Sequence, residues 1–210
     1  MVDRPQGATM RATPVLQRQR IHILQAGALM TLPLLFLAQP TWDGATHEFI
    51  EIIGICLVFA CMVGRMWSIL YVGSKKNVEL VTTGPYSMMR NPLYFFSCIG
   101  AVGVGLMYGS LLVALGLGFV AYAVFSVTAA KEADFLRSKF GPVYEAYSRR
   151  TPLFWPNPAL YSDEQEVYFS PKALKRTLLD AILFLAVFPI IEALEYLHVN
   201  GTLPILMRVL

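Results

Sequence analysis

Leu93–Ala130 reads LYFFSCIGAVGVGLMYGSLLVALGLGFVAYAVFSVTAA and contains no charged side chain. A helix needs about 20 mainly apolar residues to cross the ~30 Å hydrocarbon core of a bilayer. Leu93–Met107 and Leu111–Ala130 therefore each predict a membrane helix, and the few residues between them leave room only for a tight turn. The segment predicts a helical hairpin within a membrane.

Three further apolar runs flank this hairpin: Ile21–Ala38, Phe49–Val72 and Thr177–Leu197. The chain has 210 residues, of which 56% are hydrophobic and only 15% are charged, where globular chains average about 25% charged residues. Its mean hydropathy is +0.53. This composition excludes a disordered chain, a nucleic-acid-binding domain and most soluble enzymes. We predict an all-α, polytopic transmembrane bundle of about five spans, embedded in a lipid bilayer and carrying cytoplasmic amphipathic helices.

The basic residues predict the orientation of this bundle. Fifteen of the 17 Lys and Arg residues lie before the first span or in the two long loops that follow the second and fourth spans. Gln39–Glu48, on the other side, has none. By the positive-inside rule the N-terminus and both long loops are cytoplasmic. The polar first 20 residues predict a short tail and a retained first helix rather than a cleaved signal peptide.

Two cytoplasmic segments hold most of the polar residues. The first, residues 80–94, reads LVTTGPYSMMRNPLY and contains the turn pairs Gly84-Pro85 and Asn91-Pro92. Pro92 suits the first turn of a helix, which makes Asn91 a natural N-cap. A second interpretation is functional: Arg90, the Asn91 amide and the helix N-terminus together hold a carboxylate or phosphate. The spacing favours neither interpretation over the other.

The second segment, Lys131–Pro158, begins at the end of the fourth span with Glu132. We expect a helix that Gly141-Pro142 stops, followed by a short helix with Tyr144 and Tyr147 on one face. A basic amphipathic helix commonly lies at the lipid headgroups. That explains the basic residues of the segment, but not a carboxylate at the bilayer edge or the aromatic residues that continue to Trp155.

The remaining unusual residues are Arg65, the glycines of the third span, and the Cys and His residues. Arg65, about seven residues inside the second span, either extends to the cytoplasmic surface or pairs with a carboxylate such as Glu132. The glycines of the third span predict close packing on a neighbouring helix. The three Cys and three His residues are dispersed and form no metal-ligand pattern, so we expect no metal site.

Together these motifs resemble the isoprenylcysteine carboxyl methyltransferase family and its relatives, the integral membrane phospholipid methyltransferases. The pattern of that family is a GPY turn, R-H-P-x-Y, a two-helix hairpin, E-E-x-x-L, F-G-x-x-Y-x-x-Y and a proline-flanked aromatic stretch. In order, the matching residues are Gly84-Pro85-Tyr86, Arg90-Asn91-Pro92-Leu93-Tyr94, Glu132–Leu136, Phe140–Tyr147 and Pro152–Pro156. The resemblance covers about 90 residues, from Arg65 to Pro156.

The resemblance implies a membrane methyltransferase that uses S-adenosylmethionine, needs no metal and acts on a lipophilic acceptor at the cytoplasmic side. It implies catalytic roles for Arg90 and Glu132. The implied cofactor-binding residues are Gly84, Pro85, Tyr86, Arg90, Asn91, Tyr94, Glu132 and Tyr147. For the acceptor it leaves Arg65 and Trp155 as candidates. A prenylcysteine-like carboxylate, a lipid amine and a thiol all fit as the acceptor group.

Two residues depart from the family pattern. Asn91 replaces histidine, and it can donate a hydrogen bond but cannot act as a general base near neutral pH. Ala133 replaces the second glutamate, which bears on substrate identity more than on reaction type.

Two other functions are weighed against methyl transfer. One is an NADPH-dependent sterol-type reductase, whose R-x-D-E-x-x-C and K-Y-G-x-x-W signatures are not matched at Ala133, Leu136 and Tyr144. The other is a non-enzymatic membrane scaffold or lipid-binding protein.

The expected organisation of the chain is a tail (1–20), two membrane helices (21–72), a methyltransferase core (73–158) and a polar link with a fifth helix (159–210).

Overall fold

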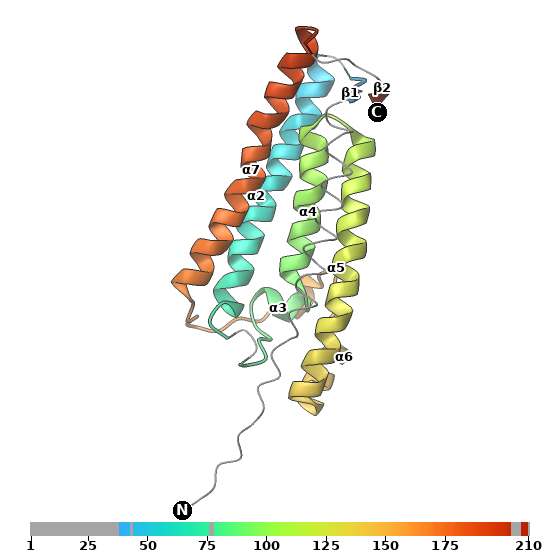
Figure 1. Cartoon of the computed structure of the whole chain (residues 1–210). Helices are drawn as coiled ribbons and strands as arrows, with labels where there is room; N and C mark the ends of the chain where they lie inside the picture. The colour runs from blue at the N-terminus through green and yellow to red at the C-terminus, as the bar shows by residue number, and fades with distance from the viewer. Residues whose placement is uncertain (1–37, 43, 76–77, 203–206, 210) are drawn as a thin grey trace, which may run out of the picture.

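The computed structural model describes residues 38–42, 44–75, 78–202 and 207–209. Its long helices are α2 (Ala45–Val72), α4 (Pro92–Met107), α5 (Leu111–Phe140) and α7 (Pro171–Val199). Shorter helical segments are α3 (Pro85–Met88), α6 (Pro142–Arg150) and the 3-10 turn η1 (Pro158–Leu160). The long helices lie in the order α7, α2, α4, α5 (Figure 1). Two three-residue strands, β1 (Ala38–Pro40) and β2 (Met207–Val209), pair in parallel.

The prediction of an all-helical membrane bundle is confirmed. Among the described residues, three helices are long and apolar enough to cross a membrane, namely α2, α5 and α7. The predicted third span is the shorter apolar helix α4 of 16 residues. The first predicted span, Ile21–Ala38, and the tail before it lie outside the described residues except for Ala38.

Glycines let α4 approach both of its neighbours closely, as the sequence predicted. A Cβ atom on Gly103 would lie 2.9 Å from the carbonyl oxygen of Gly54 in α2. On the α5 side, a Cβ atom on Gly105 would lie 2.3 Å from the Cα atom of Ala114. Larger residues would force the helices apart, so α4 is fixed between α2 and α5 by backbone contacts on two sides.

The fourth span and the helix predicted after it form one continuous helix, α5. Ser110 caps its start, where the Ser110 hydroxyl accepts a hydrogen bond from the Val113 N–H at 3.2 Å. Its end is at Gly141, which has a φ of +50° and precedes Pro142, the first residue of α6. The predicted Gly-Pro stop is therefore confirmed.

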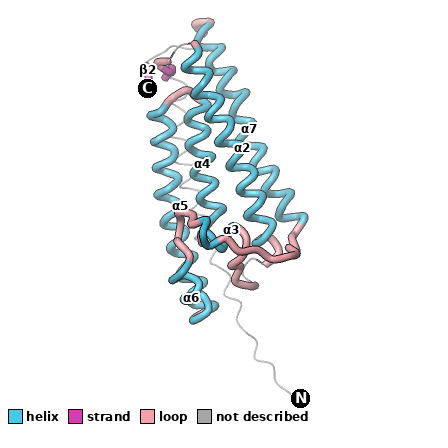
Figure 2. Tube along the Cα trace, turned by 180° about the vertical axis from the view of Figure 1, so that it is seen from behind, coloured by secondary structure: helices cyan, strands magenta, loops and turns pink. Residues whose placement is uncertain are grey.

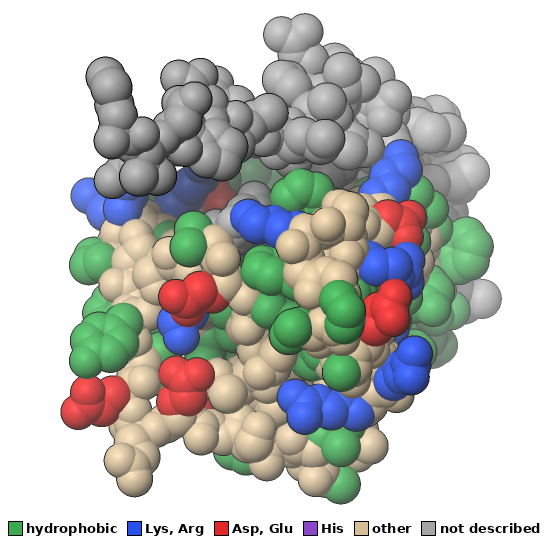
Figure 3. Space-filling view, turned by 90° about the horizontal axis from the view of Figure 1, so that it is seen from below, with side chains coloured by type: hydrophobic (Ala, Val, Ile, Leu, Met, Phe, Trp, Pro, Cys, Tyr) green, Lys and Arg blue, Asp and Glu red, His purple; other side chains and the backbone are tan. Residues whose placement is uncertain are grey.

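Both polar segments lie at the same end of the bundle (Figure 2). The loop from α2 to α4 contributes α3, and the chain from α5 to α7 contributes α6 and η1. A view onto this end shows Lys and Arg side chains interspersed with Asp and Glu (Figure 3). The residues that the sequence singled out are therefore gathered on one face, far from each other along the chain.

Candidate active site at the loop-bearing end of the bundle

The turn at Gly84 is held in a conformation that only glycine adopts readily. Gly84 has a φ of +58°, and a Cβ atom there would lie 2.4 Å from the ring of Tyr71 in α2. Pro85 then starts α3, whose first three residues are buried. The Ser87 hydroxyl donates a hydrogen bond to the Gly84 carbonyl at 2.6 Å. The turn is therefore tightly packed on the end of α2.

Arg90 follows α3 and points into the protein. Its backbone N–H donates to the Pro152 carbonyl at 2.8 Å. Its Nη1 atom lies 3.4 Å from the Tyr144 hydroxyl, a long hydrogen bond. The buried Nε atom has no hydrogen-bond partner among the described residues. A partly buried guanidinium with one weak side-chain partner leaves donors available for an anionic group.

Tyr144 and Tyr147 form the buried face of α6, as their spacing predicted. Their ring centroids are 6.2 Å apart in an edge-on arrangement. The Tyr147 hydroxyl donates to the Tyr86 carbonyl at 2.7 Å. Burial raises the pKa of Tyr147 well above its ordinary value, although the Arg90 charge acts in the opposite direction. Tyr147 therefore stays a hydrogen-bond donor and ties α6 to the Gly84 turn.

Glu132 is connected to α4 through Tyr94. The Tyr94 hydroxyl donates to Glu132 Oε2 at 2.9 Å, and the Tyr94 ring stacks on Phe125 at 5.1 Å. Side chains tilt toward the N-terminus of their helix, and α4 and α5 are antiparallel, so the two side chains lean toward each other. Burial and then the nearby Glu132 charge raise the pKa of Tyr86. Glu132 therefore acts electrostatically on the Gly84 turn.

The structure brings together most of the predicted site residues but not in every predicted pairing. One hypothesis paired Arg90 with Glu132. Arg90 instead contacts Tyr144 and Glu132 accepts from Tyr94, and no ion pair joins the two charged residues in the described part of the chain. Sequence reasoning placed Tyr144 beside Tyr147 but did not include it in the site. Its position three residues before Tyr147 was the available signal.

Asn91 lies at the N-cap position of α4, as predicted, but its side chain does not cap the helix. The Asn91 amide instead donates to the Leu153 carbonyl at 3.0 Å. This bond joins the start of α4 to the segment after α6. The geometry is therefore explained better by a structural role, in which the Asn91 amide links two loops, than by a role in anion binding.

The two candidate acceptor residues lie in different surroundings. Arg65 donates from Nη1 to the Ser97 hydroxyl of α4, and its Nε atom is buried without a partner among the described residues. The proposed pairing with Glu132 is not seen there. Trp155 is 66% exposed and packs edge-on against Phe95 and Phe154. It adds an aromatic surface beside α4 and α5.

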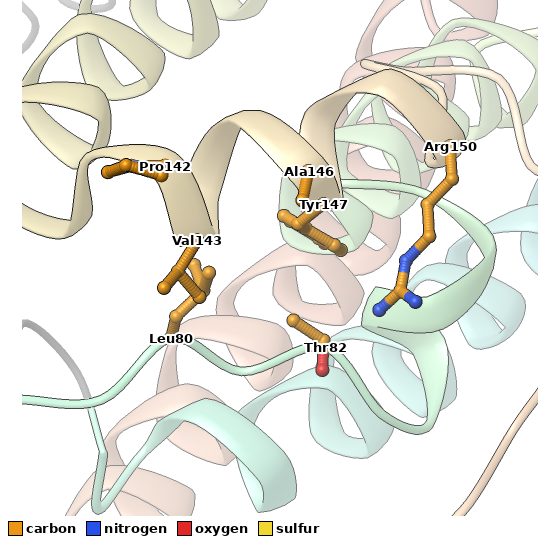
Figure 4. A pocket seen from close by; sticks show the side chains of 7 residues that line it. All are labelled: Leu80, Thr82, Pro142, Val143, Ala146, Tyr147 and Arg150. Atoms are coloured by element: carbon orange, nitrogen blue, oxygen red, sulfur yellow. The ribbon is translucent and has the colours of Figure 1, made fainter.

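A pocket of about 530 Å³ opens between α6 and the loop that leads to Gly84 (Figure 4). Most of its lining is apolar, with Arg150, Thr82 and the edge of Tyr147 as polar groups. The lining residues are Leu80, Thr82, Pro142, Val143, Ala146, Tyr147 and Arg150. Sequence reasoning included only Tyr147 of these, because residues of a loop and a helix some 60 positions apart meet only in the folded chain.

No group of three or more His, Cys, Asp or Glu residues with the geometry of a metal site occurs in the described ranges.

Some known proteins are similar to only part of this chain, and others are similar to most of it. The sequence profile of the phospholipid methyltransferase family matches residues 49–143. The protein-S-isoprenylcysteine O-methyltransferase of Schizosaccharomyces pombe is 35% identical over 83 residues, covering 39% of this chain and 35% of that protein. The profile match includes the Gly84 turn, Arg90, the hairpin and Glu132, which is where the sequence motifs lie.

Two longer matches cover most of the chain. The cobalt-zinc-cadmium resistance protein CzcN of Cupriavidus metallidurans is 32% identical over 200 residues, covering 95% of this chain and 92% of that protein. The nickel-cobalt-cadmium resistance protein NccN of Alcaligenes xylosoxydans xylosoxydans is 34% identical over 181 residues, covering 86% and 84%. No solved structure matches significantly.

These matches agree with the motifs, with the apolar helices and with the gathering of the motif residues at one end of the bundle. The family they identify is one of methyltransferases and not of reductases. The chain is an integral membrane protein of the phospholipid methyltransferase family, whose profile matches residues 49–143, and over most of its length it is related to CzcN and NccN.

Proposed function

We propose that this protein transfers a methyl group from S-adenosylmethionine to a lipophilic acceptor at the cytoplasmic boundary of the membrane. The observation that carries the proposal is the convergence of Arg90, Tyr94, Glu132 and Tyr147 on the Gly84 turn. Hydrogen bonds of 2.7 Å and 2.9 Å join Tyr147 to this turn and Tyr94 to Glu132. A passive scaffold does not require an arginine whose buried Nε atom lacks a hydrogen-bond partner among the described residues, nor a half-buried glutamate bonded to a tyrosine of a neighbouring helix.

The residues present fit the chemical groups of this cofactor. The free donors of Arg90 suit the methionine carboxylate, and Glu132 suits the ammonium group. The rings of Tyr86, Tyr94 and Tyr147 suit a sulfonium charge, which aromatic faces attract. The pocket of about 530 Å³ opens beside Tyr147, but Arg90 and Glu132 do not line it. Gly84 and Pro85 shape the turn that holds this side of the site, and Asn91 acts through the Leu153 segment.

The cofactor supplies an activated methyl group, and the chain supplies position and a dry environment. In-line displacement depends on holding the acceptor at the reacting distance while excluding water. The packed tyrosines and the Gly84 turn exclude water, while Arg90 and Glu132 orient charged groups. Asn91 cannot serve as a base. A carboxylate or thiolate acceptor needs no base. An amine acceptor would lose its proton to Glu132, whose carboxylate already accepts a hydrogen bond from the Tyr94 hydroxyl.

The lipophilic part of the acceptor is proposed to enter sideways from the bilayer. Trp155 and Tyr122, with 66% and 40% of their surface exposed, line the outside of the hairpin near the site. Arg65 lies two turns inside α2, where its buried Nε atom has no hydrogen-bond partner among the described residues, and it is our candidate for holding the acceptor there. The cytoplasmic placement rests on the excess of Lys and Arg at this end.

The names of CzcN and NccN refer to metal resistance, and a related role for this chain would be exerted through the methylated product. This part of the proposal is tested by comparing the metal tolerance of cells that express the wild type or Arg90→Ala.

Calorimetry with detergent-purified protein tests the proposal directly. Wild type is titrated with S-adenosylhomocysteine and with NADPH, beside Glu132→Ala and the matched surface variant Glu145→Ala. We expect the wild type and Glu145→Ala to bind S-adenosylhomocysteine equally and Glu132→Ala to bind it at least tenfold more weakly, because it loses one charged contact of about 1.5–3 kcal/mol. Absence of binding by the wild type would falsify the methyltransferase proposal. Binding of NADPH instead would favour the reductase.

A further inference from the structure

The chain between α6 and α7 crosses the loop-bearing end of the bundle and is bonded to the Gly84 turn. We call residues 157–168 of this link the strap. The Asn157 N–H donates to the Met88 carbonyl at 3.0 Å. The Gly84 N–H donates to the Ser162 carbonyl at 2.8 Å, and the Ser162 N–H donates to the Ser87 hydroxyl at 3.0 Å. The backbone of the strap therefore runs along both ends of α3.

Asp163 is the centre of the strap's side-chain contacts. Its Oδ1 atom accepts the Tyr71 hydroxyl at 2.7 Å and the Glu164 N–H at 2.8 Å. Its Oδ2 atom accepts the Tyr161 hydroxyl at 2.7 Å. These donors lower the pKa of Asp163 from its ordinary value, which is the direction expected for a carboxylate that accepts several hydrogen bonds. Both oxygens of this carboxylate are used within the protein.

Further contacts fasten the strap to the end of α2. Glu164 accepts the Thr83 hydroxyl at 3.1 Å and lies 3.6 Å from the Lys75 ammonium. The Ser74 hydroxyl donates to the Tyr168 carbonyl at 2.7 Å. A link with no role beyond connecting α6 to α7 would not need a series of side-chain bonds to one neighbouring loop.

Tyr71 connects Asp163 to the candidate active site. The Tyr71 ring lies directly against Gly84, where a Cβ atom would be only 2.4 Å away. Two residues on, the Tyr86 carbonyl accepts the Tyr147 hydroxyl. The Gly84 turn is thus held between the Tyr71 ring on one side and the Ser162 backbone on the other, and Asp163 holds both Tyr71 and the strap.

We propose that Asp163 is a positioning residue for the cofactor site, which acts by fixing Tyr71 and the strap on either side of the Gly84 turn. The inference rests on the proposed function, because it concerns the same cofactor. It assigns a role to a segment that the phospholipid methyltransferase profile, ending at residue 143, does not reach. The match to CzcN, which covers 95% of the chain, takes in this segment.

The test compares Asp163→Ala, Asp163→Asn and Tyr71→Phe with the wild type. The matched control is Glu166→Ala, an acidic residue of the same strap whose carboxylate has only a 3.3 Å contact with the Tyr168 hydroxyl. Two quantities are measured: hydrogen–deuterium exchange of the peptide that contains Gly84, and the dissociation constant of S-adenosylhomocysteine. Steady-state kinetics then separate the KM for S-adenosylmethionine from kcat.

We expect Asp163→Ala to accelerate exchange at the Gly84 turn and to raise the dissociation constant and the KM about tenfold, with kcat within about twofold of the wild type. Asp163→Asn keeps one acceptor oxygen, so it should give a smaller effect. Tyr71→Phe should reproduce the effect with the ring still in place, and it carries the test if Asp163→Ala does not fold. Glu166→Ala should resemble the wild type.

Two results would overturn the inference. One is an Asp163→Ala protein whose exchange and affinity equal those of Glu166→Ala. The other is faster exchange at the Gly84 turn with unchanged affinity, which would limit Asp163 to a structural role. A wild type that binds no S-adenosylhomocysteine refutes the proposed function instead, and the exchange measurement then still decides whether Asp163 holds the turn.

Discussion

Replacing Gly84 by alanine tests the packing of the candidate site, and the chain supplies its own control. Gly84 and Gly141 have nearly the same backbone conformation, with φ and ψ of 58° and −132° against 50° and −126°. A Cβ atom on Gly84 would lie 2.4 Å from the Tyr71 ring, whereas one on Gly141 would meet nothing within 4 Å. The two substitutions therefore share a conformational cost and differ in the steric one.

The expected magnitudes follow from this difference. An alanine in such a strained conformation costs about 1–3 kcal/mol. Forcing an extra methyl group into a packed site costs roughly 1–3 kcal/mol more. We expect Gly141→Ala to lower the free energy of unfolding by about 1–3 kcal/mol and Gly84→Ala by about 2–6 kcal/mol. The additional cost should appear at the turn, because the Tyr71 ring cannot move without breaking its bond to Asp163.

Reversible unfolding in mixed detergent micelles measures both free energies, and binding of S-adenosylhomocysteine measures the effect on the site. Gly84→Ala should weaken binding more than Gly141→Ala does. If the two variants are destabilised equally, within about 0.5 kcal/mol, the Tyr71 ring does not constrain the turn and the reasoning about its close packing is wrong.

Three other substitutions address single contacts of the site. Arg90→Ala should abolish methyl transfer while the protein remains folded and extractable, and unchanged activity would remove Arg90 from the site. Asn91→Asp replaces the donor to the Leu153 carbonyl by a second acceptor and should destabilise the protein by about 1–3 kcal/mol in an unfolding titration, whereas Asn91→His keeps a donor and should cost less. Tyr147→Phe leaves the Tyr86 carbonyl without its donor, at a cost of about 1–3 kcal/mol. Burial raises the pKa of Tyr147, so the stability that this phenol contributes is fully present below the ordinary tyrosine pKa of about 10. It is lost only as the pH rises through the higher pKa of the folded state. If the difference in unfolding free energy between wild type and Tyr147→Phe shrinks between pH 7 and 9, this reasoning is wrong.

Local signals in the sequence predicted much of the fold. The uncharged runs around Tyr108–Ser110 predicted the hairpin, and Gly141-Pro142 predicted the break between α5 and α6. These features depend on neighbours in the chain, because turn chemistry and apolar length act locally. The glycines of α4 predicted close packing, although they could not identify Gly54 and Ala114 as the partners.

The sequence indicated which residues lie at the same end of the bundle, but not which contacts they make there. Asn91 had the spacing of an N-cap, but the Leu153 carbonyl, some 60 residues away, takes its side chain. Arg65 contacts Ser97 rather than Glu132 for the same reason. Such choices depend on which distant backbone groups remain unsatisfied after folding, and spacing does not contain that information. The strap could not be predicted as a structural element because the hydrogen bonds that fasten it to the rest of the protein reach back to residues 71–88.

The shortness of α4 has a consequence for the lipid around it. At about 1.5 Å per residue its 16 residues span roughly 24 Å, less than the ~30 Å hydrocarbon core, while the 30 residues of α5 span roughly 45 Å. Because α4 ends and α5 begins at the same turn, Arg90 and Asn91, at the start of α4, lie beside the middle of α5 and not at its end. Where lipid contacts α4, we expect the leaflet on that side to thin or to draw its headgroups inward, a deformation that costs fractions of a kcal/mol per Å. If the protein has the proposed function, we expect an acceptor headgroup to reach Arg90 without leaving its own leaflet, and bilayer thickness to control how readily it does so.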